Sequence, residues 1–474
     1  MRSTASTSPS PARSSERGPS RFFGEKSTAA LSARLARREI SAVELVREAY
    51  RAIAERDGEL AAFVELDERR ALRAALAIDK ERRRGRIASP LAGIPTAIKD
   101  HEHMRLMGTR GGSRMLRYVR SPVDGEVARR LRAAGMPLVG KTSCSELTIL
   151  PFVETDLGPP TRNPWSLDHY SGGSSGGASC AVAAGMLPIA PGSDGAGSIR
   201  GPASFCGLVG FKPSRHALFH EHHAVDPHDI SAVGPLARTV EDAAMLLDVL
   251  AGDTSLEPDV RSFRAAVQDP PRSLRVRFCT RSRIAEVDPE VEDAVRRTAR
   301  LAEQLGHRVD EGEPLEGTVD EFLPLMSKMI SSIPQIPFAR RFVQPTTKWM
   351  LDLGAKTTPE EARAAKDLLE ARVDAWFGEA VDAWILPTSC VLPPRVGAFD
   401  GYDGEGVFRA VAPIGVWTAP FNVSGQPAVS LPMALAKSGL PIGVQVVMHR
   451  RDDRRLLGFA AQLEEAASLT SAFF

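Results

Sequence analysis

Residues 172–210 limit the possible folds of this chain more than any other segment. Glycine, serine and alanine dominate the stretch, yet it encloses the apolar run AVAAGMLPIA at residues 181–190. A flexible linker of glycine and serine would be polar on both flanks. Because glycine lets a backbone approach its neighbours closely, we interpret the segment as core backbone in close contact with another group.

Helices are predicted on both sides of this segment. Apolar residues recur at helical spacing over residues 27–53, and Ser41 with Glu44 predicts a capping box that divides them into two helices. Residues 287–306 predict an amphipathic helix with Pro289 in its first turn and Gly306 at its end. Residues 313–376 also have a helical pattern.

Strand-like segments alternate with these helices. Residues 136–139 follow a helix that stops at Gly135, and WILPT (384–388) and GLPIGVQVVM (439–448) occur near the end of the chain. This alternation indicates an α/β protein in which helices cover both faces of a sheet.

Composition excludes several classes of protein. Sixty Lys and Arg residues balance 59 Asp and Glu residues, so nothing predicts a nucleic-acid or membrane partner. The five cysteines form no CxxC pair, which favours a reducing compartment. The longest apolar stretch is too short to span a bilayer, and no secretory segment is evident, so we expect a cytoplasmic protein. Residues 1–24, rich in Ser, Pro and Arg, are predicted to be a disordered tail.

GMPLVGKT at residues 135–142 matches the phosphate-binding loop pattern letter for letter. That loop needs a strand before it and a helix N-terminus after it, so that backbone N–H groups meet phosphate. Here a helix precedes the motif, the strand lies inside it, and Pro137 lacks an N–H. We therefore reject nucleotide binding at this segment.

GGSSG at residues 172–176 matches the GxSxG nucleophile elbow. An elbow follows a buried strand and needs a histidine downstream of an acid. The preceding residues, RNPWSLDHY (162–170), contain a proline and several polar or charged groups and do not read as a buried strand. No histidine has an evident context either, so this hypothesis is also disfavoured.

Histidines crowd one segment, residues 216–228. His-Glu at residues 220–221 begins a zinc-binding HExxH motif, but Ala224 stands where the second histidine should be. We interpret the segment as a solvated loop near the mouth of a site and expect no metal ion. The histidines concerned are His216, His220, His222, His223 and His228.

Several motifs in a fixed order resemble the amidase signature family. GGSSGG (172–177) is followed by DGAGSIR (194–200), LAGIPTAIKD (91–100) lies upstream, and SGQPAVSLPM (424–433) lies downstream. The resemblance covers about residues 27–460 and is weakest over residues 313–413. It implies one large domain over residues 25–474 with a central mixed, twisted β-sheet covered by helices on both faces.

The resemblance also implies the catalytic residues. The family's nucleophile falls on Ser198, its proton-relay serine on Ser174 and its base on Lys99, and the Gly173–Ser174 peptide bond is expected to be cis. The backbone N–H groups of the implied oxyanion hole belong to Gly195, Ala196, Gly197 and Ser198. The residues implied to support the site are Ser175, Asp194 and Arg200.

The chemistry of these residue types fits those roles. A serine hydroxyl is a poor nucleophile until a base removes its proton. A lysine can be that base when burial lowers its pKa, and Lys99 ends an apolar run, AGIPTAIK. Ser174 can accept the proton of Ser198 and donate one to Lys99, so the mechanism needs no histidine, metal ion or cofactor.

One residue departs from the family pattern. Ala196 stands where many members have glycine. If this position requires a positive φ, the methyl group adds strain of about 1 kcal/mol or more.

The predicted function is hydrolysis of a small or medium-sized linear carboxylic amide through a Ser198 acyl-enzyme. Two alternatives stay open, a glutaminase subunit of a transamidation complex and a catalytically silent amidase-like binding protein. The near-neutral charge and the weakly matching residues 313–413 favour a free-standing amidase. The oligomeric state, a homodimer included, is left undecided.

The weakly matching region is predicted to be mostly helical and to form the substrate pocket. Six apolar residues recur there at helical spacing and either pack against the sheet as core or line a pocket for an apolar or aryl acyl group. These residues are Phe322, Leu323, Leu325, Met326, Met329 and Ile330.

Overall fold

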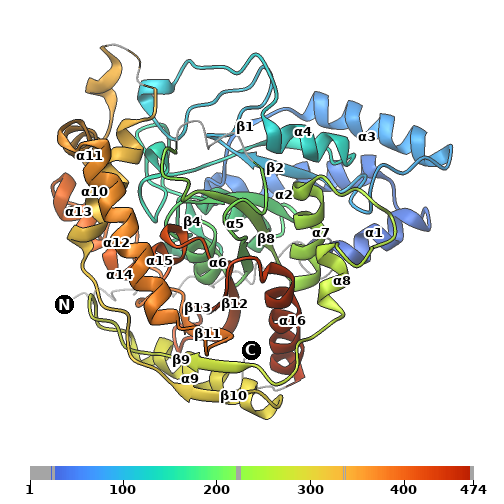
Figure 1. The fold of residues 1–474 in the computed structure, drawn as a ribbon. Coiled ribbons are helices and arrows are strands. Elements are labelled where there is room, and N and C mark those ends of the chain that lie inside the picture. Colours follow the sequence, from blue (N-terminus) through green and yellow to red (C-terminus); the bar gives the residue numbers. More distant parts are fainter. Residues whose placement is uncertain (1–22, 24–26, 220–225, 335, 337, 470–474) are drawn as a thin grey trace, which may run out of the picture.

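The computed structural model describes residue 23 and residues 27–219, 226–334, 336 and 338–469. Within them, a mixed, twisted sheet of eight strands forms the centre of the molecule (Figure 1). The two pairs β10–β9 and β9–β11 are parallel, and the other neighbours are antiparallel. From one edge to the other the strands are β10 (Arg308–Glu311), β9 (Arg275–Phe278), β11 (Ala383–Pro387), β13 (Pro441–Met448), β12 (Ala428–Leu435), β7 (Val209–Lys212), β8 (Ala232–Ala237) and β6 (Ala190–Asp194).

Two smaller sheets accompany the large one. In the first, β3 (Leu138–Thr142) lies between β1 (Phe63–Leu66) and β2 (Thr96–Lys99). The second is a hairpin of β4 (Arg162–Asn163) and β5 (Ser166–Tyr170). Strand β2 packs beside β6, so the three-stranded sheet brings the end of β2 close to the edge of the large sheet.

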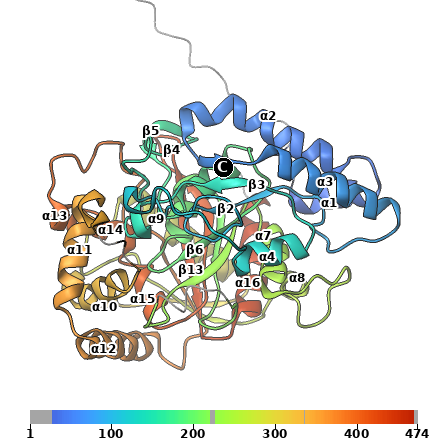
Figure 2. The same cartoon turned by 90° about the horizontal axis from the view of Figure 1, so that it is seen from above.

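Helices cover both faces of the large sheet, as the alternation of segments predicted (Figures 1 and 2). One face carries α5 (Gly176–Ala183) and α6 (Arg200–Cys206). The elements on and around the other face are α1 (Thr28–Ala36), α7 (Val240–Ala251), α8 (Phe263–Val267), α9 (Pro289–Gln304) and α16 (Asp453–Leu469). Beside the small sheet lie α2 (Ala42–Leu60), α3 (Glu68–Arg83) and α4 (Glu126–Ala133).

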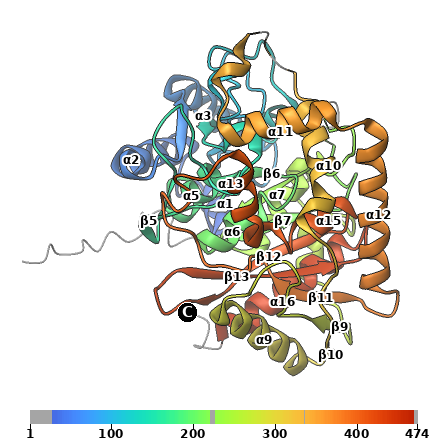
Figure 3. The same ribbon diagram turned by 90° about the vertical axis from the view of Figure 1, so that its left-hand side faces the viewer.

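Residues 319–377 and 404–423 form a helical layer on one side of the sheet, and β11, which lies between them in the chain, belongs to the sheet itself (Figure 3). Helix α10 packs on both α11 and α12, and α12 packs on α15. An apolar cluster inside this layer includes Met326, Ile330 and Met350. The helices are α10 (Val319–Ser331), α11 (Pro345–Lys356), α12 (Pro359–Phe377), α13 (Gly404–Ala410), α14 (Ala412–Gly415) and α15 (Ala419–Val423).

Local sequence signals placed several of these elements correctly. Ser41 and Glu44 form both bonds of a capping box at the start of α2, which separates it from α1. Helix α9 begins at Pro289 and ends just before Gly306, whose φ is +91°. Strand β3 begins two residues later than expected and extends to Thr142.

Two further expectations concern the residues before GGSSG and the predicted tail at residues 1–24. The residues before GGSSG contain the short strand β5, which pairs with β4 and is partly exposed, so it is not the buried strand that a nucleophile elbow needs. Of the predicted tail, residues 1–24, only Phe23 is described, and its side chain is fully buried. No helix in the described ranges is long and apolar enough to cross a membrane.

Candidate active site

Lys99 is the last residue of β2, whose four side chains are all buried. Its Nζ donates hydrogen bonds to Ser174 Oγ at 2.7 Å and to Ser193 Oγ at 3.0 Å. Burial disfavours the charged amine and lowers the pKa of Lys99 to about 8, against the opposing effect of nearby acidic groups. A fraction of this lysine is therefore neutral near pH 7, as a general base requires.

Ser174 and Ser175 lie in the turn between β5 and α5. Ser174 is fully buried, and the Gly173–Ser174 peptide bond is cis, as the resemblance implied. The Ser175 hydroxyl donates to the carbonyl oxygen of Ser193 at 3.1 Å, and its N–H donates to that of Ser198 at 3.2 Å. These bonds hold the two glycine- and serine-rich segments against each other.

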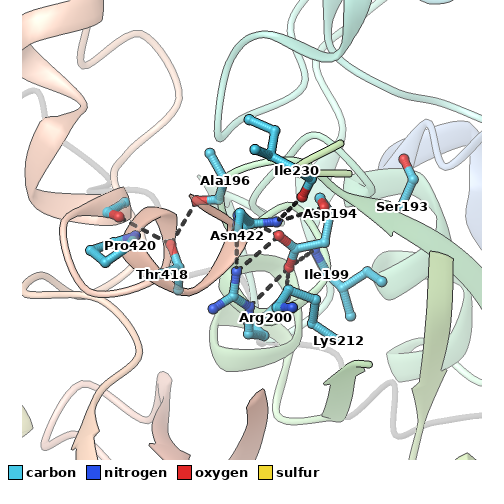
Figure 4. A network of polar contacts seen from close by, with 12 residues as sticks. Ser193, Asp194, Ala196, Ile199, Arg200, Lys212, Ile230, Thr418, Pro420 and Asn422 are labelled. Atoms are coloured by element: carbon cyan, nitrogen blue, oxygen red, sulfur yellow. Dashed lines mark hydrogen bonds and ion pairs between the residues drawn. The ribbon is translucent and has the colours of Figure 1, made fainter. Parts of the chain in front are cut away.

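The carboxylate of Asp194, at the end of β6, organises the loop that carries Ser198 (Figure 4). It accepts the N–H groups of Gly197 at 2.6 Å and Ile199 at 3.1 Å. The Arg200 guanidinium donates to the same carboxylate at 3.0 and 2.9 Å. Burial alone would raise the pKa of Asp194, but the charge and hydrogen bonds of Arg200 hold it well below its usual value.

Two further residues complete this fully buried network. Arg200 donates to Asn422 Oδ1 at 2.5 Å and to Gln445 Oε1 at 2.7 Å. Asn422 in turn donates to the carbonyl oxygen of Asp194 at 2.7 Å (Figure 4). Neither residue was among the expected site residues. The available signal was a polar glutamine inside the apolar strand segment PIGVQVVM, because a buried polar side chain needs partners.

The loop leaves three of the four expected oxyanion donors free. We had expected the N–H of Gly197 to be available to a substrate, but it donates to Asp194 instead. Among the described residues, the N–H groups of Gly195, Ala196 and Ser198 have no acceptor. The Ser198 hydroxyl likewise has no hydrogen-bond partner in the described part of the chain.

The anticipated strain at Ala196 does not occur, because the positive φ of this loop falls on the next residue. Gly197 has φ +124°, whereas Ala196 is not among the residues with positive φ. The carbonyl oxygen of Ala196 accepts a hydrogen bond from Thr418 Oγ1 at 2.7 Å. A methyl group is therefore tolerated at residue 196, and glycine is required at residue 197.

Gly197→Ala is expected to lower kcat/KM by about a hundredfold, because the added Cβ would overlap Thr418 Oγ1 and displace the Ser198 loop. The unfavourable φ should also cost about 1–3 kcal/mol of stability, measurable as a lower Tm. Gly58→Ala is the matched control, because nothing lies within 4 Å of the added Cβ in α2. Equal activity of the two variants would contradict the requirement for glycine at residue 197.

Ser198 lies between two cavities. The first has an empty volume of about 1220 Å³, its open mouth included. Its walls are mainly apolar, with Glu316 and Arg372 as charged groups among them, and come mostly from the helical layer and residues 411–423. The apolar lining includes Phe322, Leu369, Phe408, Val411, Val416 and Trp417. The second, of about 680 Å³, is lined by Ser174, Ser193, Gly195, Ala196 and Ser198 together with part of α10. Both serines of the expected triad thus line one cavity, with Lys99 bonded to Ser174 from behind.

The six apolar residues of α10 divide between the two roles predicted for them, which are lining a cavity and packing in the core. Phe322 and Met326 line the first cavity, and Met326, Met329 and Ile330 line the second. The side chains of Leu323 and Leu325 are instead buried in apolar clusters.

The secondary structure expected around the phosphate-loop pattern is confirmed. Strand β3 (Leu138–Thr142) lies inside the motif and α4 precedes it, which is the reverse of the strand–loop–helix order of a phosphate-binding loop. Lys141 is buried and donates to the carbonyl oxygen of Glu102.

Two histidines of the segment 216–228, His216 and His228, lie within the described residues. His220, His222 and His223 lie outside the described residues. His216 is exposed and lies 2.8 Å from Asp229, and His228 is buried. No group of three metal-ligating side chains occurs in the described part of the chain.

Comparison with known proteins adds independent findings. The model of the Amidase family matches residues 44–457. AmiB2 of Mycobacterium tuberculosis is 36% identical over 385 residues, which are 80% of this chain and 82% of AmiB2. The 6-aminohexanoate-cyclic-dimer hydrolase of Paenarthrobacter ureafaciens is 35% identical over 428 residues, covering 82% and 86% of the two chains.

Solved structures agree with these sequence matches. A substrate complex of 6-aminohexanoate cyclic dimer hydrolase has a TM-score of 0.84 at 31% identity, covering 93% of this chain and 97% of that one. A bacterial aryl acylamidase of the amidase signature family has a TM-score of 0.82 at 26% identity, covering 93% and 96%. The chain therefore belongs to the amidase signature family of hydrolases.

Proposed function

We propose that this enzyme hydrolyses carboxylic amides through an acyl-enzyme on Ser198. The observation that carries the proposal is the fully buried Lys99, bonded at 2.7 Å to Ser174, behind the cavity that both serines line. Neutral Lys99 takes the proton of Ser174 as Ser174 takes that of Ser198, whose oxygen attacks the carbonyl carbon. The free N–H groups of Gly195, Ala196 and Ser198 stabilise the oxyanion.

The remaining steps reverse this proton transfer. Ser174 returns a proton to the amide nitrogen, the C–N bond breaks, and the amine or ammonia leaves. A water molecule then attacks the acyl-enzyme, activated by the same Lys99 and Ser174, and the carboxylate is released. Every proton moves along the Lys99–Ser174 pair, so no histidine is required.

The lining of the large cavity favours a substrate whose acyl group is apolar or aromatic. Its walls include Phe322, Leu369, Phe408 and Trp417, which offer aliphatic and aromatic contact. The similar hydrolase named for a cyclic dimer indicates that cyclic as well as linear amides belong in a substrate screen. Glutamine suits this cavity poorly, because Arg372 is already paired with Glu321 at 2.7 Å and most of the remaining wall would desolvate the charged ammonium and carboxylate against apolar side chains.

Hexanamide is expected to exceed acetamide in kcat/KM by about tenfold or more. Each additional buried methylene contributes about 0.8 kcal/mol, and part of that is offset by ordering the chain. Initial rates of ammonia release with purified enzyme measure the ratio. Better turnover of acetamide or of glutamine would contradict the apolar acyl cavity.

The value of kcat/KM should rise with pH and level off near pH 8. Because burial lowers the pKa of Lys99 to about 8, the neutral base is the minor form below that pH. Activity should therefore fall about tenfold per pH unit on the acid side and level off above pH 8. A profile that is flat from about pH 5 to pH 9 would rule out Lys99 as the base.

The experiment that tests the function is a hydrolysis screen over aryl, alkyl, peptide and cyclic amides. Labelling of the enzyme by a fluorophosphonate, with loss of labelling in Ser198→Ala, would identify the nucleophile. Absence of both labelling and turnover would instead favour a catalytically silent binding protein.

A further inference from the structure

We propose that the second cavity receives the amine part of the substrate, so that the enzyme prefers N-substituted amides over primary amides. This inference rests on the proposed function and assigns a direction to the amide bond within the site. The second cavity is called the amine-side cavity below. The large apolar cavity is called the acyl-side cavity.

The direction follows from the position of the proton donor. The leaving nitrogen must receive a proton from Ser174 Oγ as the C–N bond breaks, so it must lie on the side of Ser174. Ser174 lines the amine-side cavity and is absent from the walls of the acyl-side cavity, whereas Ser198 lines both. A carbonyl carbon bonded to Ser198 therefore places its nitrogen in the smaller cavity and its acyl chain in the larger one.

The amine-side cavity extends beyond the space that ammonia needs. Its volume of about 680 Å³, open mouth included, continues past Ser174 along α10, where Met329 and Ile330 form an apolar wall. A primary amide would leave this wall in contact with water. An alkyl substituent on the nitrogen would cover it and gain hydrophobic contact.

The amine-side cavity favours a neutral substituent over a charged one, although it also has polar residues. Asp226 lines it, but its carboxylate already accepts the N–H groups of His228, Ile230 and Ser231 at 3.2, 2.8 and 2.7 Å. These three hydrogen bonds hold the loop of residues 226–231 in place. The His101 side chain also lines this cavity, and its Nε2 lies 3.3 Å from Ser193 Oγ. The substituent assigned to this cavity is an uncharged alkyl chain, because Met329 and Ile330 offer it apolar contact while Asp226 keeps its backbone partners.

Paired substrates with one acyl group test the assignment. We expect N-butylhexanamide to exceed hexanamide in kcat/KM by about tenfold or more with the native enzyme. N-Alkylation does not by itself make an amide easier to hydrolyse, so the excess would report contact with the amine part. A ratio near or below one would overturn the inference.

Two matched tryptophan substitutions on neighbouring helices separate the cavities. Met329→Trp fills the amine-side cavity from α10, and Leu369→Trp fills the acyl-side cavity from α12. Met329→Trp should lower the N-butyl to primary ratio at least tenfold, whereas Leu369→Trp should lower the hexanoyl to acetyl ratio instead. Equal changes of both ratios in the two variants would overturn the assignment.

A third variant covers the case in which Met329→Trp does not fold. Met329→Ala widens the same cavity and should raise the turnover of N-hexylhexanamide relative to N-butylhexanamide. No change in that ratio would count against the inference. If the native enzyme hydrolyses no amide at all, the proposed function fails. If it hydrolyses amides but prefers primary ones, only the direction proposed here fails.

Discussion

Replacing Ser198 by alanine is expected to lower kcat/KM by more than about ten-thousandfold for every amide that the enzyme hydrolyses. The hydroxyl is the atom that forms the acyl-enzyme, and Ser174 is fully buried behind it. Initial rates with a substrate found in the screen, at high enzyme concentration, measure the loss. Residual activity above about 1% of the native rate would move the nucleophile to another residue, most simply to Ser174.

The structure of the Ser198→Ala variant should be unaffected. Within the described residues the Ser198 hydroxyl has no hydrogen-bond partner, so its removal leaves no buried group unsatisfied. The Tm of the variant should therefore lie within a few degrees of the native value. A large drop in Tm would mean that lost activity reports lost folding.

Lys99→Met is expected to lower the rate of acylation by at least about a thousandfold, since the base is removed while a side chain of similar length is kept. Methionine cannot accept the proton of Ser174, and the hydrogen bonds of 2.7 and 3.0 Å to Ser174 and Ser193 are lost. Single-turnover kinetics of amine or ammonia release measure acylation directly. Near-native rates would exclude Lys99 as the base.

A second buried lysine provides the matched control. Lys212 is also fully buried, burial lowers its pKa to about 7, and its Nζ donates to the carbonyl oxygen of Pro213 at 2.9 Å. It lines neither cavity. Lys212→Met should therefore keep acylation within about tenfold of the native rate. A loss as large as that of Lys99→Met would show that any missing buried lysine disables the enzyme.

Short-range signals in the sequence predicted elements whose causes are local. Ser41 and Glu44 cap α2 because both groups lie within one helical turn, and Pro289 starts α9 for the same reason. The strand register was less predictable. Strand β3 begins two residues later than predicted and ends at Thr142, because its bounds depend on pairing with β1 and β2 and not on its own residues alone.

The sequence by itself determined the fold class, the family and the side chains that carry the proposed chemistry. These properties reside in short, ordered motifs such as GGSSGG and DGAGSIR, in which neighbouring residues act together. The resemblance also placed Asp194 and Arg200 beside Ser198, six or fewer residues away along the chain.

Only the tertiary structure decided which groups stay free for a substrate. Asn422 and Gln445 reach Arg200 across 222 and 245 residues of sequence, and that network turns the N–H of Gly197 toward Asp194. The two cavities likewise depend on distant elements, because α10 lines both of them and α12 lines the larger one. Such contacts depend on the relative placement of distant elements, and the local pattern of residues carries no record of that placement.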